Sequence, residues 1–220
     1  MNKVLFKEDD MKTIYRWALA LLALGFLGAA GAAQAAKVGD PAPDFAATDS
    51  HGKLHKLADL KGKFVVLEWH NQNCPFVKSQ YKGKMQALQE KWTQKGVQWF
   101  TVISSAPGME GYVEATAANE DVKKTKAHVT AVFLDPKGTI GHAYGAKTTP
   151  HMFVIDPKGV LVYDGAIDNA PLEDESAAKN RAGEAFVNYV DRALQETLVD
   201  GKSQVSIPST PPYGCHVKYK

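Results

Sequence analysis

The chain alternates between nearly continuous apolar runs and segments whose apolar residues recur every three or four positions. Residues 64–69 are apolar except for Glu68, which is typical of a strand covered on both faces of a sheet. From Val77 to Trp92 the apolar residues recur at helical spacing. Further elements are predicted as strands at 97–103 and 131–134, and as helices at 75–96 and 111–126. This alternation of strands and helices predicts an α/β fold.

Two hairpins are expected beside these core elements. Residues 45–48 and 54–57 flank a polar turn and predict a small hairpin at the front of the domain. Residues 152–155 and 160–164 flank an Asp-Pro-Lys-Gly turn and predict a second one.

The C-terminal part of the chain changes character after Gly201. Before it, apolar residues at four-residue spacing predict a helix between about residues 177 and 198 that docks on the sheet: Phe186, Val190 and Leu194. After it, three prolines exclude a helix and favour an extended strap: Pro208, Pro211 and Pro212. This strap carries Cys215.

The N-terminal residues have the pattern of an export signal. Lys12 and Arg16 precede an apolar run over residues 17–27, and Ala33-Gln34-Ala35 follows. This pattern predicts a signal peptide at 1–35, cleaved after Ala35, and a periplasmic or secreted protein without stable membrane insertion. The alternative is an uncleaved membrane anchor over residues 17–36. The mature chain is then divided into an α/β domain at 36–200 and a proline-rich arm at 201–220.

Composition limits the possible functions. The 220 residues are 45% hydrophobic and 23% charged, which suits one sizeable core. The net charge is +2 and no basic block occurs, which argues against a nucleic-acid partner. Two cysteines are too few for a disulfide-rich scaffold, a four-thiolate zinc site or an iron–sulfur cluster held by cysteines. In an oxidising compartment the two can form a disulfide.

Cys74 is the first candidate for chemistry. It follows a loop that leaves the predicted central strand, and Pro75 stands where a helix would begin. The amide groups and the dipole at the start of a helix favour a thiolate, which is the reactive form of cysteine. The alternative is an inert, buried cysteine.

Several motifs together resemble a known family. They are Trp69, the run Cys74-Pro75-Phe76-Val77-Lys78, Tyr144-Gly145, Thr149-Pro150, Phe153-Val154-Ile155-Asp156 and Gly159. The combination is similar to the thioredoxin-fold redoxins of the alkyl hydroperoxide reductase/thiol-specific antioxidant group, over roughly residues 38–168. The resemblance implies a thioredoxin-like fold, with a central mixed sheet flanked by helices and an N-terminal hairpin extension.

The resemblance also implies roles for individual residues. Cys74 matches the first cysteine of the thioredoxin Cys-x-x-Cys motif, whereas Val77 stands at the second. Some other thiol must therefore resolve a mixed disulfide, and Cys215 is the candidate within the chain. Glu68 matches a buried carboxylate that serves as a proton acceptor, and an exposed strand-end glutamate is the alternative. Substrate contacts are implied for Trp69, Pro75, Phe76, Thr149 and Pro150, the last two as a cis-proline loop.

These residues favour a thiol-disulfide oxidoreductase that acts on protein thiols or disulfides. A peroxide reductase is the second hypothesis, although the Pro-x-x-x-Thr/Ser-x-x-Cys pattern of peroxiredoxins is absent and Arg181 and Arg192 both fall in the predicted last helix. A binding protein with a structural Cys74–Cys215 disulfide is the third. A copper site that adds His70 or His216 to the thiols is a minor alternative, and no metal or other cofactor is expected.

Overall fold

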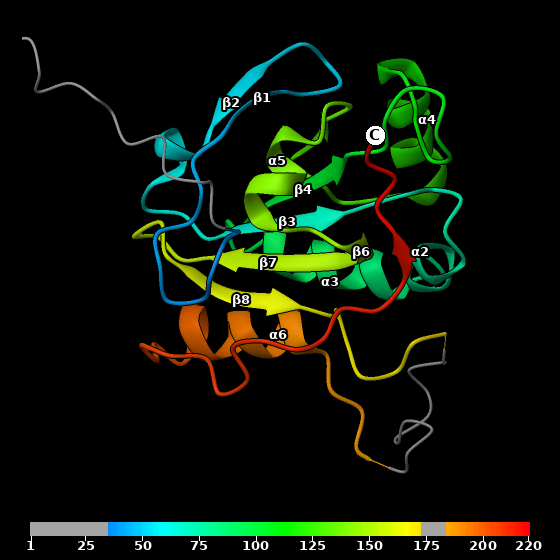
Figure 1. Ribbon diagram of the computed structural model, residues 1–220. Helices are drawn as coiled ribbons and strands as arrows, with labels where there is room; N and C mark the ends of the chain where they lie inside the picture. Colours follow the sequence, from blue (N-terminus) through cyan, green and yellow to red (C-terminus); the bar gives the residue numbers. More distant parts are fainter. Residues whose placement is uncertain (1–34, 173–183) are drawn as a thin grey trace, which may run out of the picture. The chain divides into compact units, whose positions relative to one another are not determined.

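A five-stranded mixed sheet forms the centre of the computed structural model, which describes residues 35–172 and 184–220 (Figure 1). The strand order is β5-β4-β3-β7-β8, and β3 pairs parallel with β4 and antiparallel with β7. The bounds are β3 Val65–Trp69, β4 Gln98–Ile103, β5 Ala131–Leu134, β7 His151–Ile155 and β8 Leu161–Gly165. Every residue of β3 is buried, as its nearly continuous apolar run predicts. The predicted mixed sheet is confirmed.

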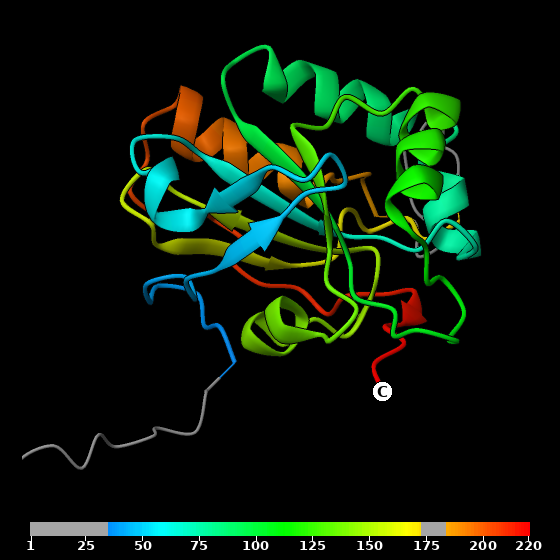
Figure 2. The same ribbon diagram turned by 90° about the horizontal axis from the view of Figure 1, so that it is seen from above.

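Two layers cover the sheet. Val66 of β3 packs in the cluster shared with α3 (Lys84–Thr93) and α6 (Tyr189–Leu194), whereas Leu67 packs in the cluster on the opposite face. That opposite face carries α5 (Thr139–Tyr144), and Figures 1 and 2 show α5 and α6 on opposite sides of the sheet. Side chains alternate across a strand, so β3 contributes to both layers.

The predicted N-terminal hairpin is confirmed as a separate two-stranded sheet. Its strands are β1 (Ala46–Thr48) and β2 (Leu54–Lys56), and the 3-10 helix η1 (Leu57–Leu60) follows. The helix α4 (Ala115–Thr125) lies between β4 and β5 in the chain and places Ala118 against Ile103 and Val132. The helix predicted at 111–126 is therefore confirmed with a later start.

The helix predicted at 75–96 begins at Pro75 as expected, but its continuity is wrong, because the structure has two helices there. The first, α2, spans Pro75–Gln80, and α3 begins only at Lys84. Gly83 has a φ of +126°, a conformation that L side chains rarely adopt, so the chain turns between the two helices. The apolar spacing still holds across the turn, since Met85, Leu88 and Trp92 are buried.

The last helix is shorter than predicted, and one short helix was not predicted. Asn188 caps α6 by accepting a hydrogen bond from the Asp191 amide, so the helix begins at Tyr189 and excludes Phe186. A π-helix, η2 (Gln195–Val199), continues α6, while the predicted part at 177–183 lies outside the described residues. The unpredicted helix is α5, whose six residues are too few to show a clear period.

The proline-rich arm is an extended strap, as predicted. Its first part runs along the edge of the sheet, where Ser209 forms a parallel bridge with Asp164 of β8. Farther on, β9 (Cys215–His216) pairs antiparallel with β6 (Thr148–Thr149). Figure 1 shows this red segment crossing below β8 and turning up beside β6 and α2.

The N-terminal predictions fall largely outside what the structure describes. The proposed signal peptide occupies residues 1–35, and the description begins at Ala35. Within residues 35–172 and 184–220, no helix has the length and apolar character needed to cross a membrane. The signal peptide and the domain limits therefore stay predictions.

Candidate active site

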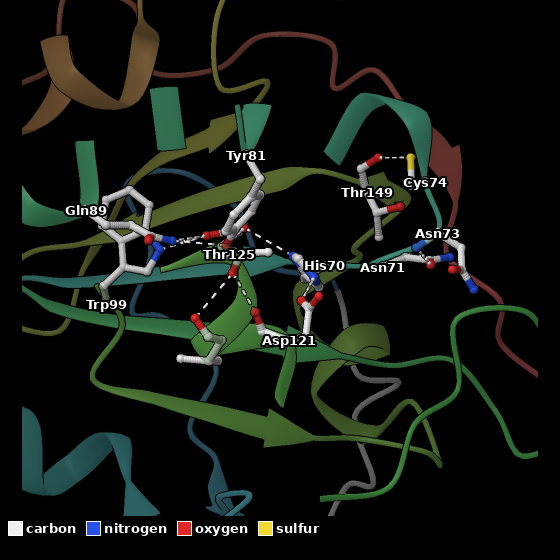
Figure 3. Close-up of polar contacts among 12 residues, drawn as sticks. His70, Asn71, Asn73, Cys74, Tyr81, Gln89, Trp99, Asp121, Thr125 and Thr149 are labelled. Carbon is white, nitrogen blue, oxygen red and sulfur yellow. Dashed lines mark hydrogen bonds and ion pairs between the residues drawn. The ribbon is translucent and has the colours of Figure 1, made fainter. Parts of the chain in front are cut away.

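Cys74 lies at the start of α2, where the loop after β3 ends. It is the N-cap residue of this helix, Pro75 is the first helical residue, and the Cys74 side chain is fully buried. Its thiol donates a hydrogen bond to the Thr149 carbonyl oxygen at 3.0 Å (Figure 3). The Thr149–Pro150 peptide bond is cis, as the resemblance implies. The predicted nucleophile and the predicted proline loop are therefore in direct contact.

Cys215 reaches the same place from the arm. Residue Cys215 is opposite Thr149 in the β6–β9 ladder, and its Sγ atom lies 2.9 Å from the Sγ atom of Cys74. Both cysteines are free thiols in the structure, and Cys215 is half-buried. Two residues that are 141 positions apart in sequence are thus adjacent at the site.

Gly214 permits this close approach. Its φ is +137°, and a Cβ atom at this position would overlap the Thr149 carbonyl group. Any larger residue would therefore push the arm away from β6. The glycine immediately before Cys215 is the part of the sequence that lets the two sulfur atoms meet.

The two thiols differ in acidity. Burial alone raises the pKa of Cys74, but hydrogen bonds from Cys215, the Val77 amide and the Thr149 side chain outweigh it and hold the pKa below its usual range. Burial and the hydrogen bond and negative charge of Cys74 raise the pKa of Cys215 to about 11. Deprotonation of the pair therefore yields a thiolate on Cys74 and a thiol on Cys215.

A buried carboxylate ties the arm to the helix that bears Cys74. Asp168 is 1% exposed and accepts hydrogen bonds from the Tyr213 hydroxyl at 2.5 Å and from Gln80 of α2 at 2.9 Å. Gln80 also donates to the Tyr213 hydroxyl at 3.1 Å, and the Tyr213 ring lies 5.8 Å from that of Phe76. No pattern in the sequence predicted this network. Its only signal was an aromatic residue two positions before Cys215.

Glu68 is fully buried, which decides between its two alternatives. Its carboxylate accepts hydrogen bonds from three donors at 2.7 to 3.0 Å: Tyr81 Oη, Gln89 Nε2 and Trp99 Nε1. Figure 3 shows Tyr81, Gln89 and Trp99 grouped on one side, with His70 between them and Cys74. The contacts of Glu68 are therefore with this core group, whereas those of Cys74 are with Thr149 and Cys215.

His70 lies between two carboxylates. Its Nε2 atom lies 3.1 Å from Asp121 of α4, and its Nδ1 atom lies 3.5 Å from Glu68. Burial alone lowers the pKa of His70, but hydrogen bonds and charges from Asp121 and Glu68 raise it to about 9. No sequence spacing indicated Asp121, because it lies 51 residues from His70 and comes from a different element.

The remaining predicted substrate residues lie at different depths. Pro75 is exposed, Phe76 is half-buried and Thr149 is 2% exposed. Trp69 is fully buried in the core and donates a hydrogen bond to Ser104 at 3.0 Å. The Trp69 indole is therefore bonded within the core, whereas the Thr149 carbonyl contacts the Cys74 thiol.

No metal site is found in the described part of the chain. Within it, no group of three or more His, Cys, Asp or Glu side chains is arranged to hold an ion. His70, a candidate copper ligand, is instead held by Glu68 and Asp121.

A mixed sheet of this order, with a thiol at the start of the helix after its central strand and a cis-proline opposite, defines a thioredoxin-like redoxin. The chain belongs to the AhpC/TSA family, whose model matches residues 38–164.

Several known proteins are similar to this chain. The thiol-disulfide oxidoreductase ResA of Bacillus thuringiensis subsp. konkukian is 29% identical over 145 residues, covering 64% of this chain and 79% of ResA. An uncharacterized conserved protein from Geobacillus kaustophilus has a TM-score of 0.71 at 23% identity, over 84% of this chain and 93% of that one. A putative thiol:disulfide interchange protein DsbE from Chlorobium tepidum has a TM-score of 0.52 at 25% identity, over 76% and 98% of the two chains.

Proposed function

We propose that this protein is an exported thiol-disulfide oxidoreductase in which Cys74 is the nucleophile and Cys215 the resolving cysteine. The observation that carries the proposal is the 2.9 Å separation of two free cysteine sulfur atoms, one of which has a lowered pKa. The names of the relatives support the same chemistry, since they are thiol-disulfide oxidoreductases and a putative thiol:disulfide interchange protein.

The proposed reaction exchanges disulfides between protein substrates and this pair. The Cys74 thiolate attacks a substrate disulfide, forms a mixed disulfide and releases one substrate thiolate. Cys215 then attacks the Cys74 sulfur, which forms the Cys74–Cys215 disulfide and releases the second substrate thiolate. Val77 stands where a Cys-x-x-Cys motif has its resolving cysteine, so the arm supplies this thiol instead. Pro75, Phe76, Thr149 and Pro150 are the proposed substrate contacts around Cys74.

Glu68 has a positioning role in this proposal. Three donors from the core occupy its carboxylate, and it lies 3.5 Å from His70. It therefore acts on the site through His70 and through β3, whose end leads into the Cys74 loop. A direct proton transfer between Glu68 and Cys74 is not part of the mechanism.

Export is proposed from the signal pattern at 1–35, and it suits a protein whose two cysteines are proposed to form a disulfide. N-terminal sequencing of the protein from the periplasm of an expressing cell tests it. We expect the chain to begin at Ala36, and a chain that retains residues 1–35 would contradict cleavage.

A turnover assay tests the proposed activity. The full chain is incubated with a disulfide-bonded protein and dithiothreitol, and release of substrate thiols is followed. We expect C74S to match the uncatalysed rate. When reduced C215S is mixed with the substrate in the absence of dithiothreitol, we expect a mixed disulfide between Cys74 and the substrate to accumulate, because the resolving step is lost. Unchanged turnover in C74S would overturn the proposal.

A rescue variant separates resolution by Cys215 from a structural role. Val77→Cys in the C215S background places a second thiol at the resolving position of the Cys-x-x-Cys motif. We expect it to restore turnover, whereas Val77→Ala in the same background does not. The same proteins are tested with hydrogen peroxide. Turnover confined to the peroxide would assign the peroxide-reductase function instead.

A further inference from the structure

The two sulfur atoms of the proposed redox pair differ in their access to solvent. Cys74 is fully buried, whereas Cys215 is half-buried on the arm that lies over it. An external thiol breaks a disulfide by approaching along the S–S axis, from the far side of the sulfur that it attacks. Cys74 exposes no surface to such a thiol, whereas Cys215 is partly exposed.

The arm is fastened on both sides of Cys215. Before the cysteine, the Tyr213 hydroxyl is bonded to Asp168 and Gln80. After it, the Val217 amide donates to the Lys147 carbonyl at 2.9 Å, and the Lys218 carbonyl accepts from the Ala106 amide at 2.9 Å. The chain end is also held, because the Tyr219 hydroxyl donates to the Ala146 carbonyl at 2.9 Å and its ring stacks on His142 at 4.1 Å. Such contacts keep the arm over Cys74.

The arm also occupies the strand edge beside Cys74. β9 is paired with β6, so the edge at Thr148–Thr149 is not open to another extended chain. While a Cys74–Cys215 disulfide ties β9 in place, an incoming polypeptide cannot displace it from this edge. In the reduced protein only non-covalent contacts hold β9, and a substrate strand can compete for the edge.

We propose that the external thiol that reduces the Cys74–Cys215 disulfide attacks Cys215, and that Cys74 is the leaving group. The two halves of the cycle then use different sulfur atoms: the reduced protein attacks its substrate with Cys74, and the oxidised protein receives electrons at Cys215. The inference rests on the proposed function, because it requires a redox-active disulfide.

The step balances with a thiol as the electron donor. The donor thiolate forms a bond to Cys215 Sγ, the Cys74–Cys215 bond breaks, and its electron pair stays on Cys74. A second thiolate of the donor then attacks the donor's own sulfur in the mixed disulfide and displaces Cys215. The donor ends as a disulfide, and the protein ends with two reduced cysteines. The site is built to stabilise the Cys74 thiolate, and a thiol of lower pKa leaves faster.

Peptide mapping identifies the sulfur that is attacked. Trypsin places Cys74 in peptide 64–78 and Cys215 in peptide 203–218. The oxidised full chain is mixed with excess glutathione, quenched in acid at short times, and digested after N-ethylmaleimide has labelled the free thiols. We expect glutathione on peptide 203–218 at least tenfold more often than on peptide 64–78. Glutathione mainly on peptide 64–78 would overturn the inference.

A pair of glycine variants tests whether the docked arm causes this preference. Gly214→Ala pushes the arm from Thr149, so we expect it to shift glutathione toward peptide 64–78. Gly201→Ala is the matched control, because Gly201 also has a positive φ, +67°, but has no atom within 4 Å of the added Cβ. The control is expected to keep the wild-type ratio. Equal shifts in both variants would overturn the role of the arm.

A protein that forms no Cys74–Cys215 disulfide under oxidising conditions would overturn the proposed function itself, which is a distinguishable result.

Discussion

Two buried carboxylates of this molecule have similar burial but different partners. Glu68 in β3 is fully buried and is bonded by core residues, Tyr81, Gln89 and Trp99. Asp168, which follows β8, is 1% exposed and is bonded by Gln80 of α2 and Tyr213 of the arm. Glu68 therefore stabilises the sheet on which the site is built. Asp168 instead holds the C-terminal arm, which brings Cys215 to Cys74.

The largest effect is expected from removing Glu68. Glu68→Ala removes an acceptor that three buried donors share and a counter-charge from His70, so we expect the free energy of unfolding to fall by about 4 kcal/mol. Chemical denaturation measures it. Glu120→Ala removes an exposed carboxylate from α4 and serves as the control, with a change within about 0.5 kcal/mol. A loss as small as that of the control would contradict the structural role of Glu68.

The next effect is the pH dependence of stability through His70. Its pKa is raised from 6.5 to about 9, so its contribution is fully present below pH 6.5 and is lost as the pH rises through 9. We expect this histidine to account for a loss on the order of 3 kcal/mol across that window. Denaturation at several pH values compares the wild type with His70→Gln, which should lack this slope. His216→Gln, at an exposed site, should keep it. Equal slopes in the wild type and His70→Gln would contradict the assignment.

A smaller and more local effect is expected at Asp168. Tyr213→Phe removes the hydroxyl bonded to this buried carboxylate, which costs about 2 kcal/mol. We expect the loss to loosen the arm more than the sheet, so the Val217 amide should exchange its hydrogen faster while the β3 amides do not. Hydrogen exchange measures both.

Tyr112→Phe is the control for this variant, because the Tyr112 hydroxyl bonds Glu114 at the surface. If the Val217 amide exchanged at the same rate in Tyr213→Phe and Tyr112→Phe, the proposed role of Asp168 in holding the arm would be contradicted.

Much of the fold could be predicted from local patterns in the sequence. The apolar run at 64–69 indicated a central strand, and β3 lies between β4 and β7. The helix break at Gly83 was missed because apolar spacing continued across it. The late start of α6 was missed because Phe186 fits the four-residue spacing of the helix, although Asn188 is the N-cap and the helix begins only after it. The side-chain period correctly indicated the burial of Met85, Leu88 and Trp92 in the first case and of Val190 and Leu194 in the second, but Phe186 is only half-buried and the helix bounds were wrong in both.

The site was less accessible to sequence reasoning, since its partners come from distant parts of the chain. Cys74 could be recognised from Pro75 and the preceding strand, and Cys215 from the need for a second thiol. The Asp168–Gln80–Tyr213 network and the His70–Asp121 pair had no local signal, because residues 45 to 133 positions apart form their hydrogen bonds. Such pairs are set by how β8, α2, α4 and the arm pack.

A redox titration with mass analysis tests directly whether Cys74 and Cys215 form a reversible disulfide. The full chain is equilibrated in glutathione buffers of increasing oxidising power, and the peptides 64–78 and 203–218 are followed as a linked or separate pair. We predict a linked pair that titrates between about −120 and −270 mV, the range of thioredoxin-like catalysts. A pair that resists reduction below about −300 mV would be a structural disulfide and would contradict the account, as would two thiols that never link.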